Sequence, residues 1–475
     1  MAYITGDNNA NQLIGTSNGD DIYAYGGNDF IDGREGDDEL DGGLGNDTVI
    51  GGDGNDFLSA GDGSVLDPPG NDTLSGGNGD DSFSSYAGND TIDGGAGNDY
   101  VTVLFENSSA NITYTAFDAA TGSGIITDGA GQSLTYSSVE SFYLRGGSGN
   151  DDLRGGILND FIEGKLGNDT VTGNAGNDRV YGSIGNDLVD GGSGNDLLSD
   201  VGDDTLIGGA GDDRIVTTGG RAIADGGAGK DTLWISYNSS TSNITYSAFD
   251  PIASSGTITD GAGNSVTYNS IGNFNIAGGS GNDDLRGVNG NDTLFGSRGN
   301  DILTSNAGND VLGGSYGYDN LNGGDGNDTL DGGGRVYLFS LAPEIDTLTG
   351  GTGSDYFRLG GFNSDAGRPN HFYDDRDNST SGLGEYALVK DFNSAEDIIA
   401  LSASGNSSIP SASQFVLGSS PISGLSGTGI YLNSDGAAGV GRTDELLAVL
   451  EGASNLSLTA SYFNYVVDPP TPIGG

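Results

Sequence analysis

The sequence has no cysteine and a single histidine among its 475 residues. Without cysteine no disulfide can form, which fits many secreted bacterial proteins. No stretch approaches the roughly 18 consecutive apolar residues of a membrane-spanning helix, so we expect no membrane insertion. Residues 1–7 carry neither a basic segment nor an apolar core, and we expect no cleavable signal peptide.

Basic residues are also scarce, with 16 Lys plus Arg against 68 Asp plus Glu and a formal net charge of −52. Such a charge should keep the chain unfolded by self-repulsion unless cations neutralise it. It argues against nucleic acid and anionic membrane surfaces as partners. Glycine is abundant, with 90 residues, but it does not recur at every third position, which excludes collagen.

A nine-residue repeat fills most of the chain. Residues 42–50 and 51–59 both follow the pattern Gly-Gly-x-Gly-x-Asp-x-apolar-x. Two residues after each acidic position the side chain is apolar, from Val49 and Leu58 onward to Phe357. A disordered linker rich in Gly and Asp has no reason to keep that phase, so the pattern predicts a repeat fold.

The acidic positions fall into three blocks, with a spacing of nine that slips to eight at Asp29 and Asp204. Each is a candidate metal ligand. The first block has Asp21, Asp29, Asp38, Asp47, Asp56, Asp72, Asp81, Asp90 and Asp99; the second has Asp151, Asp160, Asp169, Asp178, Asp187, Asp196, Asp204, Asp213 and Asp231; the third has Asp283, Asp292, Asp301, Asp310, Asp319, Asp328, Asp346 and Asp355.

Each block also contains one turn without its acidic residue, near 61–69, 217–225 and 333–344. Arg221 and Arg335 lie in the last two of these turns. One hypothesis is that each guanidinium partly replaces a missing ion against neighbouring carboxylates. We favour the alternative that these turns are insertions in surface loops.

Two related modules separate the blocks. Residues 111–114 recur as 243–246, and residues 126–131 recur as 258–263, both at an offset of 132. Alternating Thr, Tyr and Ile around a Gly-containing turn predicts a β-hairpin. The hairpins either pack on one edge of the repeat structure or present contact surfaces, since insertions in repeat proteins often gather on the binding face.

From about Gly361 the repeat stops. The remaining segment predicts mostly strands, with room for one short helix at 443–451, and it can cap the repeats with a core of its own. The resulting division is a first repeat block at 1–103, a hairpin insertion at 104–145, a second block at 146–234, a duplicated hairpin insertion at 235–277, a third block at 278–360 and a cap or secretion region at 361–475.

The repeat has the chemistry of a calcium site. Calcium takes six to eight oxygen ligands at about 2.3–2.6 Å. Glycine lets the backbone turn sharply and point carbonyl oxygens inward, and Asp adds a short carboxylate. Stacked loops about 4.8 Å apart can share an ion, whereas without it the Asp row is a destabilising ladder of like charges.

The apolar core is thin, because each nonapeptide buries one side chain. That burial contributes roughly 1.5–3 kcal/mol, while ordering nine residues costs about 1–2 kcal/mol each. Ion binding must supply the difference, so folding and calcium binding should be one event. Two nonapeptides would make one turn, with two parallel sheets facing each other, and the fold class is all-β.

In its nonapeptide pattern the sequence resembles the hemolysin-type calcium-binding repeats of secreted RTX proteins. The resemblance implies a right-handed parallel β-roll, a β-solenoid with calcium between adjacent loops. It also implies type I secretion through an uncleaved C-terminal signal and folding outside the cell. Residues 390–392 with 397–401 resemble the closing segment of the family, whereas the Pro-rich 468–472 departs from its usual ending. Shared ligands suggest on the order of 20 calcium ions.

No enzyme motif accompanies the repeats. There is neither a His-Glu-x-x-His zinc motif nor a Gly-x-Ser-x-Gly nucleophile elbow. The single histidine, His371, has Asp374 and Asp375 nearby, but a lone histidine in a polar loop is usually solvated. We expect no catalytic activity.

The leading hypothesis is therefore a secreted, calcium-dependent structural protein at the cell surface, a subunit of a surface layer, sheath or fibre. The hairpins and the 21 Tyr residues would supply contacts for self-assembly. The alternative is an adhesin or carbohydrate-binding module for a cell-surface glycan. Its aromatic platform would be Tyr114, Phe117, Tyr136, Phe142 and Tyr143. Ice binding would need regular outward rows of Thr, which the sequence lacks.

Overall fold

The computed structural model describes residues 1–61, 70–86, 88–333, 345–359, 361–363, 368–370, 386–401, 412–432, 440 and 445–465. The chain divides into two compact units, Met1–Asp231 and Thr232–Gly475. As predicted, the described residues form an all-β fold, with two short 3-10 helices, η1 (Ala119–Thr121) in the first unit and η2 (Ala412–Gln414) in the second. Among the described residues, no helix has the length and apolar character to cross a membrane.

The first unit consists of short strands joined by tight loops. Its strands are β1 (Tyr3–Thr5), β2 (Gln12–Ile14), β3 (Asp21–Tyr23), β4 (Phe30–Glu35), β5 (Glu39–Asp41), β6 (Thr48–Asp53), β7 (Phe57–Ser59), β8 (Thr73–Asn78), β9 (Ser82–Ser85), β10 (Asn89–Ala96), β11 (Tyr100–Leu104), β12 (Thr113–Asp118), β13 (Ser123–Thr127), β14 (Ser133–Ser137), β15 (Ser141–Arg145), β16 (Asp152–Arg154), β17 (Phe161–Leu166), β18 (Thr170–Thr172), β19 (Arg179–Gly185), β20 (Leu188–Ser193), β21 (Leu197–Gly202), β22 (Thr205–Ala210), β23 (Arg214–Thr217) and β24 (Arg221–Ala228).

The second unit is built in the same way. Its strands are β25 (Thr232–Ser236), β26 (Thr245–Asp250), β27 (Ser255–Thr259), β28 (Ser265–Asn269), β29 (Asn273–Ala277), β30 (Asp284–Arg286), β31 (Thr293–Arg298), β32 (Ile302–Thr304), β33 (Val311–Tyr316), β34 (Asn320–Asp325), β35 (Thr329–Gly333), β36 (Ile345–Thr352), β37 (Tyr356–Leu359), β38 (Gly361–Asn363), β39 (Arg368–Asn370), β40 (Tyr386–Val389), β41 (Ile398–Leu401), β42 (Phe415–Ser419), β43 (Gly427–Leu432), β44 (Glu445–Glu451) and β45 (Phe463–Tyr465).

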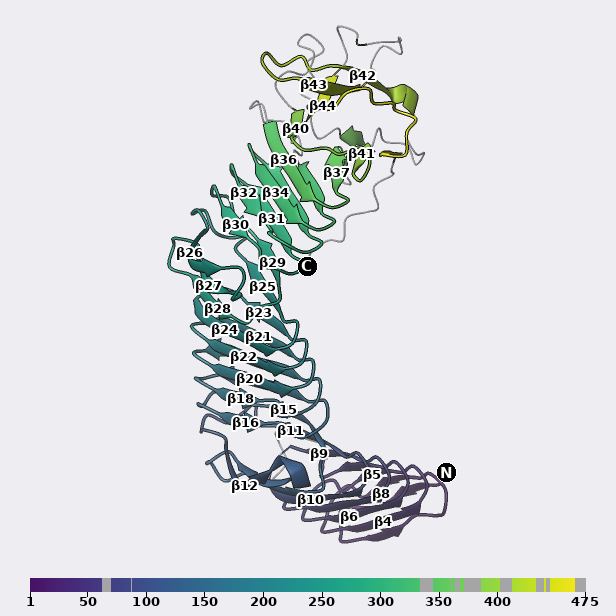
Figure 1. The fold of residues 1–475 in the computed structure, drawn as a ribbon. Coiled ribbons are helices and arrows are strands. Elements are labelled where there is room, and N and C mark those ends of the chain that lie inside the picture. The colour runs from purple at the N-terminus through teal and green to yellow at the C-terminus, as the bar shows by residue number, and fades with distance from the viewer. Residues whose placement is uncertain are drawn as a thin grey trace. The chain divides into compact units, whose positions relative to one another are not determined.

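Each turn of the coil, or rung, contributes one strand to each of two parallel sheets. β3 pairs with β5 and β5 with β7 in one sheet, while β4 pairs with β6 and β6 with β8 in the other (Figure 1). The register aligns Ile22 with Leu40 and Leu40 with Leu58, so equivalent residues are two nonapeptides apart. This is the β-roll that the repeat predicts.

The core is the single file of apolar side chains that the sequence phase predicts. In one sheet of the first block Ile22, Leu40 and Leu58 are fully buried, and in the facing sheet Ile31 and Val49 are fully buried. Their neighbours along each strand face outward, because successive side chains of a strand alternate between its faces. One buried side chain per nonapeptide is too thin a core to hold the coil alone.

The hairpin modules are spliced into the roll as extra strands. β12, β13 and β14 pair antiparallel, and β14 then lies parallel to β10 as its next rung. β15 returns to the other sheet between β11 and β17. In the second unit β26, β27 and β28 form the same antiparallel arrangement, so the predicted hairpins are confirmed, with a third strand attached to each.

Two of the three degenerate turns lie largely outside the described residues, at 62–69 and 334–344. The strands around them keep their register, with Thr48 opposite Thr73 and Asn320 opposite Thr347. The paired residues are 25 and 27 positions apart in the chain instead of the usual 18. Both turns are therefore insertions, as we favoured.

The roll continues beyond the last repeat. β40 lies parallel to β36 and β41 lies parallel to β37, so both sheets gain a rung from residues without the nonapeptide pattern. The helix allowed at 443–451 is absent from its described part, because residues 445–451 form β44. β44 is a central strand between β40 and β43, and residues 446–450 are buried there.

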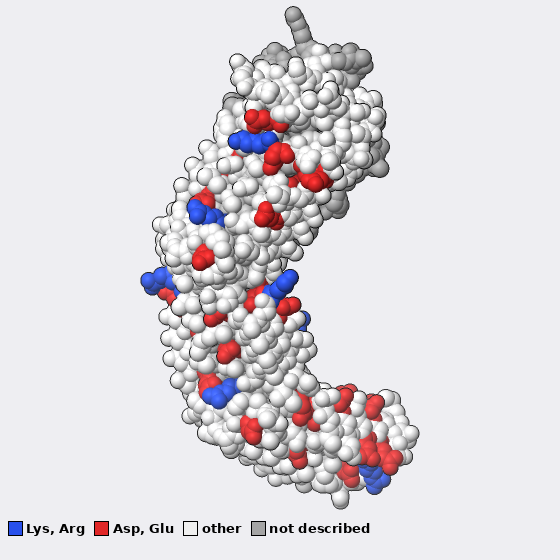
Figure 2. Space-filling view, in the orientation of Figure 1, with Lys and Arg blue, Asp and Glu red and all other residues white. Residues whose placement is uncertain are grey.

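Much of the acidic charge lies inside the fold. Figure 2 shows scattered acidic side chains on the visible face, most of which carries neither sign of charge. Several basic residues sit beside an acid, as Arg154 does beside Asp152 at 2.6 Å and Arg286 beside Asp284 at 2.6 Å. The buried carboxylates form the site described next.

Candidate metal centre

Two rows of buried aspartates run along each repeat block, one at each edge of the roll. Within a row, the Oδ1 atom of an Asp accepts a hydrogen bond from the backbone N–H of the residue one rung earlier, which in most rungs is the equivalent Asp. Asp38 accepts from Asp20 at 2.7 Å, and Asp47 accepts from Asp29 at 2.8 Å. This hydrogen bond connects neighbouring rungs through one carboxylate oxygen, and it leaves the second oxygen, Oδ2, available for another partner.

Burial raises the pKa of these carboxyl groups. The pKa of Asp38 is raised to about 6 and that of Asp72 to about 7 by burial, with neighbouring aspartates adding to the shift. The pKa of Asp301 reaches about 8 for the same reasons. A row of ionised carboxylates therefore destabilises the fold unless positive charge neutralises it.

In most repeats the Oδ2 atom is buried and has no hydrogen-bond partner. These orphaned atoms belong to Asp29, Asp38, Asp47, Asp56, Asp81, Asp99, Asp169, Asp178, Asp187, Asp196, Asp213, Asp231, Asp301, Asp310 and Asp328. A buried carboxylate oxygen without a partner is costly, and a cation would remove that cost.

The first glycine of the repeat completes the oxygen environment. A Cβ atom at Gly33 would overlap the Oδ2 atom of Asp38 and lie 2.8 Å from the carbonyl oxygen of Gly51 on the next rung. Gly51 is placed in the same way against Asp56 and the carbonyl oxygen of Gly76, 2.7 Å away. Carboxylate and carbonyl oxygens thus converge where a side chain would be, and these are the ligands that calcium prefers.

The second residue of each such loop has a left-handed backbone. In every loop with an orphaned Oδ2 its φ is positive, including non-glycine residues such as Arg34 at 84° and Lys165 at 82°. We call these the open loops. The left-handed second residues are Tyr25, Arg34, Gly43, Gly52, Gly77, Gly95, Lys165, Asn174, Ser183, Gly192, Gly209, Gly227, Ser297, Asn306 and Gly324.

Six other loops lack the left-handed residue and satisfy the carboxylate with their own backbone. The Asp90 loop, whose second residue Tyr86 is not left-handed either, does so with a side chain instead, because the Ser85 hydroxyl donates to the Asp90 Oδ2 atom at 2.7 Å. In the six, which we call closed loops, the N–H of the second residue donates to the Oδ2 atom of the same loop. The donors and acceptors are Thr16 to Asp20 at 2.6 Å, Gly147 to Asp151 at 3.0 Å, Gly156 to Asp160 at 2.7 Å, Gly279 to Asp283 at 3.0 Å, Val288 to Asp292 at 2.9 Å and Asn393 to Asp397 at 2.7 Å.

Nearly all aspartates singled out in the sequence lie in these rows. All of them except Asp21 are buried. The sequence phase is wrong at Asp21, because Asp20 holds the acidic position of that loop, while Asp21 begins strand β3 and is half-buried. The spacing from Asp20 to Asp29 is then the regular nine, and the slip to eight remains only at Asp204.

Two further acids extend the rows. Asp397 accepts a hydrogen bond from the N–H of Asp355 at 3.0 Å, although its loop has no nonapeptide glycines. Glu140 accepts from the N–H of Asp99 at 2.8 Å, where the first module returns to the roll. The sequence signal for both was an apolar residue two positions later, Ile399 and Phe142, each of which is buried.

The degenerate turn at 217–225 is neither an insertion nor a guanidinium site. Leu206 lies opposite Ala224 at the usual spacing, so no residues are inserted. Ala222 takes the acidic position and is buried. The guanidinium of Arg221 is exposed and pairs with Asp203 at 2.9 Å, outside the buried row. Arg335 lies outside the described residues.

The fifth position of the repeat forms a third row on the surface. The side-chain oxygen of Asn150 accepts from the backbone N–H of Asn168 at 2.9 Å, and Asn168 accepts from Asn186 at 2.9 Å. Because each asparagine bonds to the next rung, its recurrence in the sequence reflects a structural ladder.

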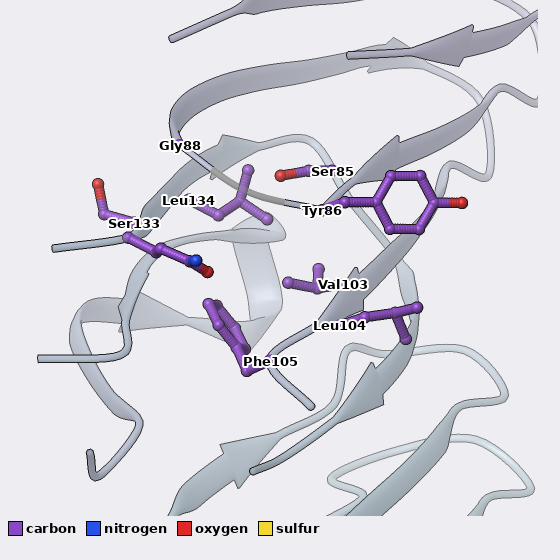
Figure 3. Close-up of a pocket in the computed structure, with 9 residues that line it drawn as sticks. Ser85, Tyr86, Gly88, Val103, Leu104, Phe105, Ser133 and Leu134 are labelled. Carbon is purple, nitrogen blue, oxygen red and sulfur yellow. The ribbon is translucent and has the colours of Figure 1, made fainter. Parts of the chain in front are cut away.

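The described residues offer little room for a substrate near the first module. A small cavity there is lined by Ser85, Tyr86, Val103, Phe105 and Leu134 among others, and it has space for about one water molecule (Figure 3). His371, the catalytic candidate weighed from the sequence, lies outside the described residues.

A model of the RTX calcium-binding nonapeptide repeat matches residues 5–40, 32–64, 69–101, 143–162, 163–198, 200–233, 277–312, 306–334 and 344–364. The unmatched stretches 102–142 and 234–276 contain most of the two modules. No curated protein matches the chain. The match covers more than half of the chain, and it agrees with the rows of buried aspartate: this chain belongs to the family of RTX calcium-binding nonapeptide repeat proteins.

Proposed function

We propose that this protein is an extracellular, calcium-dependent structural protein whose roll folds as its open loops bind calcium. The observation that carries the proposal is the set of buried, unpartnered Oδ2 atoms at the open loops. The Asp carboxylates and the carbonyl oxygens of the first glycines would hold the ions. Bound calcium would neutralise each row and join neighbouring rungs.

The two kinds of loop set the ion count. An open loop offers a carboxylate oxygen with no other partner, whereas a closed loop has already used that oxygen. The number of ions should therefore follow the open loops, on the order of 20 or somewhat fewer.

The same electrostatics supports a location outside the cell. In a compartment with little calcium, ionised carboxylates in the rows would oppose folding, and the chain would stay extended enough to be exported. In millimolar calcium outside the cell it would fold. Export through an uncleaved C-terminal signal of the type I kind is part of this proposal.

The proposed role is that of a subunit of a surface layer, sheath or fibre. Its support is that most described residues belong to the roll or to the two modules. In each module the outermost described strand, β12 or β26, pairs on one side only, with β13 or β27, and its other side lies partly against β16 or β30. Edge strands present N–H and C=O groups that can pair with a second copy of the chain.

The module aromatics favour this role over glycan binding. Tyr136 and Phe142 are buried against each other, with ring centroids 5.1 Å apart. The Tyr114 hydroxyl donates to the carbonyl of Arg154 at 2.9 Å, and the Arg154 guanidinium lies 5.3 Å from the centre of the Phe117 ring. These four rings hold the module to the roll and are withdrawn from the predicted sugar platform. Tyr143, the fifth residue of that platform, is half-buried and stacks on Phe161 with ring centroids 4.6 Å apart.

Negative-stain electron microscopy of the full chain in millimolar calcium, with a chelated control, tests the proposal. Ordered sheets or fibres that disappear on chelation are the expected result. Rods that form in calcium and never associate would refute the structural role, and a glycan array on the same protein would then test the adhesin alternative. A chain that binds no calcium would refute the whole proposal.

A further inference from the structure

One loop of the second block differs from all neighbouring loops. It runs from Asp200 to Asp204 and is one residue shorter than the regular loop, which places an acid where Gly182 and Gly164 stand in the preceding rungs. It lies between strands β21 and β22 (Figure 1). Asp200 is 2% exposed, so its side chain points into the roll.

Three carboxylates meet at this loop. Asp187, Asp200 and Asp204 each contribute an oxygen, and the three oxygens lie within 4.8 Å of one another. The Oδ2 atoms of Asp200 and Asp187 both occupy the space beside Gly182 that a Cβ atom would fill. Asp187 and Asp204 belong to the regular row, because the Asp187 N–H donates to Asp204 at 3.0 Å, and Asp200 is the addition.

The added carboxylate is only half satisfied. Its Oδ1 atom accepts from the N–H of Val201 at 2.8 Å, while its Oδ2 atom is buried without a hydrogen-bond partner, as is the Oδ2 atom of Asp187. On the next rung Thr217 lies opposite Asp200 in the sheet, and its buried Oγ1 atom also lacks a partner. The unpartnered Oδ2 atoms of Asp187 and Asp200 therefore share one space inside the roll, beside Gly182.

We propose that Asp187, Asp200 and Asp204 together bind a single calcium ion that is held more tightly than the ions of the regular open loops. This inference rests on the proposed function, because it assumes that the rows bind calcium. The site would fill first as calcium rises and empty last as calcium is withdrawn.

The geometry and the charge both support a tighter site. Oxygens bound to one calcium at about 2.3–2.6 Å can be no more than about 5 Å apart, and the three oxygens meet that limit as they stand. A regular site draws on the carboxylates of its own row, whereas this site has one more. Calcium affinity rises with the number of charged ligands and with the rigidity of the site.

A shared proton is the competing account of the same contacts. Burial, followed by the charges of Asp204 and Asp187, raises the pKa of Asp200 to about 7. A proton held between Asp187 and Asp200 would satisfy both Oδ2 atoms without a metal ion. The experiment must therefore count ions as well as measure stability.

Two substitutions at Asp200 separate these accounts. Asp200→Asn keeps the size of the side chain and removes its charge. Asp200→Ser is a second variant that should fold, because Ser85 and Ser305 hold the same position in other loops and are buried there. The matched control is Asp212→Asn, which removes one charge from an exposed fifth position where Asn is the usual residue.

The measurement is the calcium content of the full-length protein, by elemental analysis, after dialysis against a series of calcium buffers. We expect the wild type and Asp212→Asn to retain about one ion at free calcium roughly tenfold below the level that fills the remaining sites. Both Asp200 variants should lose that ion and keep the others. Circular dichroism in millimolar calcium checks that each variant folds.

Three other outcomes distinguish failure of this inference from failure of the proposed function. If the Asp200 variants keep every ion at every calcium concentration, Asp200 is not a ligand and the shared proton explains the contacts. If the wild type shows no tightly held ion but fills many sites together, the inference fails and the proposed function survives. If the wild type binds no calcium, the proposed function fails.

Discussion

The open loop before Asp178 and the closed loop before Asp160 are 18 residues, or one rung, apart, and they satisfy the buried carboxylate differently. Both bury an aspartate. At Asp160 the backbone N–H of Gly156 donates to the second carboxylate oxygen, whereas at Asp178 the left-handed Asn174 turns its N–H away and the oxygen is orphaned. In these two loops the backbone conformation of the second residue thus decides whether the carboxylate finds a partner within its own loop.

The closed loops are not scattered at random. One pair, ending at Asp151 and Asp160, follows the first module within the first unit. The other pair, ending at Asp283 and Asp292, follows the second module within the second unit. The module and the two loops that satisfy their own carboxylates recur together at the offset of 132 residues. We therefore expect the join between module and roll not to depend on calcium.

Removing calcium with a chelator should produce the largest difference in stability between open and closed loops. Removing calcium leaves every open row as uncompensated negative charge, and we expect most of the roll to unfold cooperatively. Hydrogen exchange should then be fast throughout the open loops and slowest in peptides spanning 105–160, which contain the first module and two closed loops. Equal exchange in both regions would show that the closed loops confer no independent stability.

The response to pH should reverse between the calcium-free and calcium-loaded protein. Burial raises the pKa of Asp38 to about 6 and of Asp178 to about 7, so the calcium-free folded state binds protons that the unfolded chain has released. Its stability is greatest near pH 4 and falls as the pH rises toward about 7. The calcium-loaded protein should lose ions on acidification instead, because protons compete for the carboxylates.

Far-ultraviolet circular dichroism at a series of pH values, with chelator and with millimolar calcium, measures both responses. Residual strand structure at pH 5 in chelator that disappears by pH 8 is the expected result. Identical curves with and without calcium would mean that protons and calcium do not share these carboxylates.

Single substitutions should separate one open loop from one closed loop. Asp178→Asn should remove at least one bound ion and lower the free energy of unfolding by about 3 kcal/mol. The reason is that a buried calcium site would lose one of its charged ligands. Asp160→Asn should keep every ion and lower the free energy of unfolding by about 1–3 kcal/mol. An amide has only one acceptor oxygen, so it cannot replace both oxygens of the carboxylate, one of which accepts from the Gly156 N–H. Calcium content and urea unfolding of both variants give the test, and loss of an ion from Asp160→Asn would contradict the division.

The smallest expected change in stability comes from substituting the second residue of a loop. Arg34→Gly should stabilise the protein by up to about 1 kcal/mol, because a non-glycine residue at positive φ is strained and Arg34 is exposed. Thr16→Gly in a closed loop should instead destabilise it by about 0.5–1 kcal/mol, since glycine is freer in the unfolded chain. Thermal unfolding of both variants checks the opposite signs.

The sequence predicted the roll and most of the aspartate rows because each nonapeptide repeats the same phase of Asp and apolar residue. Where two acids are adjacent, as at Asp20 and Asp21, the phase is ambiguous, and only the buried Ile22 decides it. Asp397 was missed as a row member because its loop lacks the glycines of the motif. Asp200 was missed because an acid at the first position departs from the motif, and its inward direction follows only from the sheet.

The division into open and closed loops was beyond the sequence for a physical reason. Thr16 and Val288 at the second position could have indicated closed loops, since β-branched residues avoid positive φ. Gly147, Gly156 and Gly279 gave no such signal, because glycine adopts either conformation. The sequence left room for a short helix at 443–451 because the consecutive apolar residues of the strand at 445–451 show no alternation, which is natural for a central strand buried on both faces.

The surface ladder of asparagines has a consequence for the chemical stability of the protein over time. Asparagine ages by deamidation, in which the backbone nitrogen of the following residue attacks the side-chain carbonyl carbon. At Asn46, for example, the following nitrogen belongs to Asp47 and donates to Asp72 at 2.8 Å, while the Asn46 carbonyl oxygen accepts from the N–H of Asn71 at 2.8 Å. Both groups are held apart from each other, so the folded roll should resist this chemical damage, whereas the unfolded chain would accumulate it at every rung.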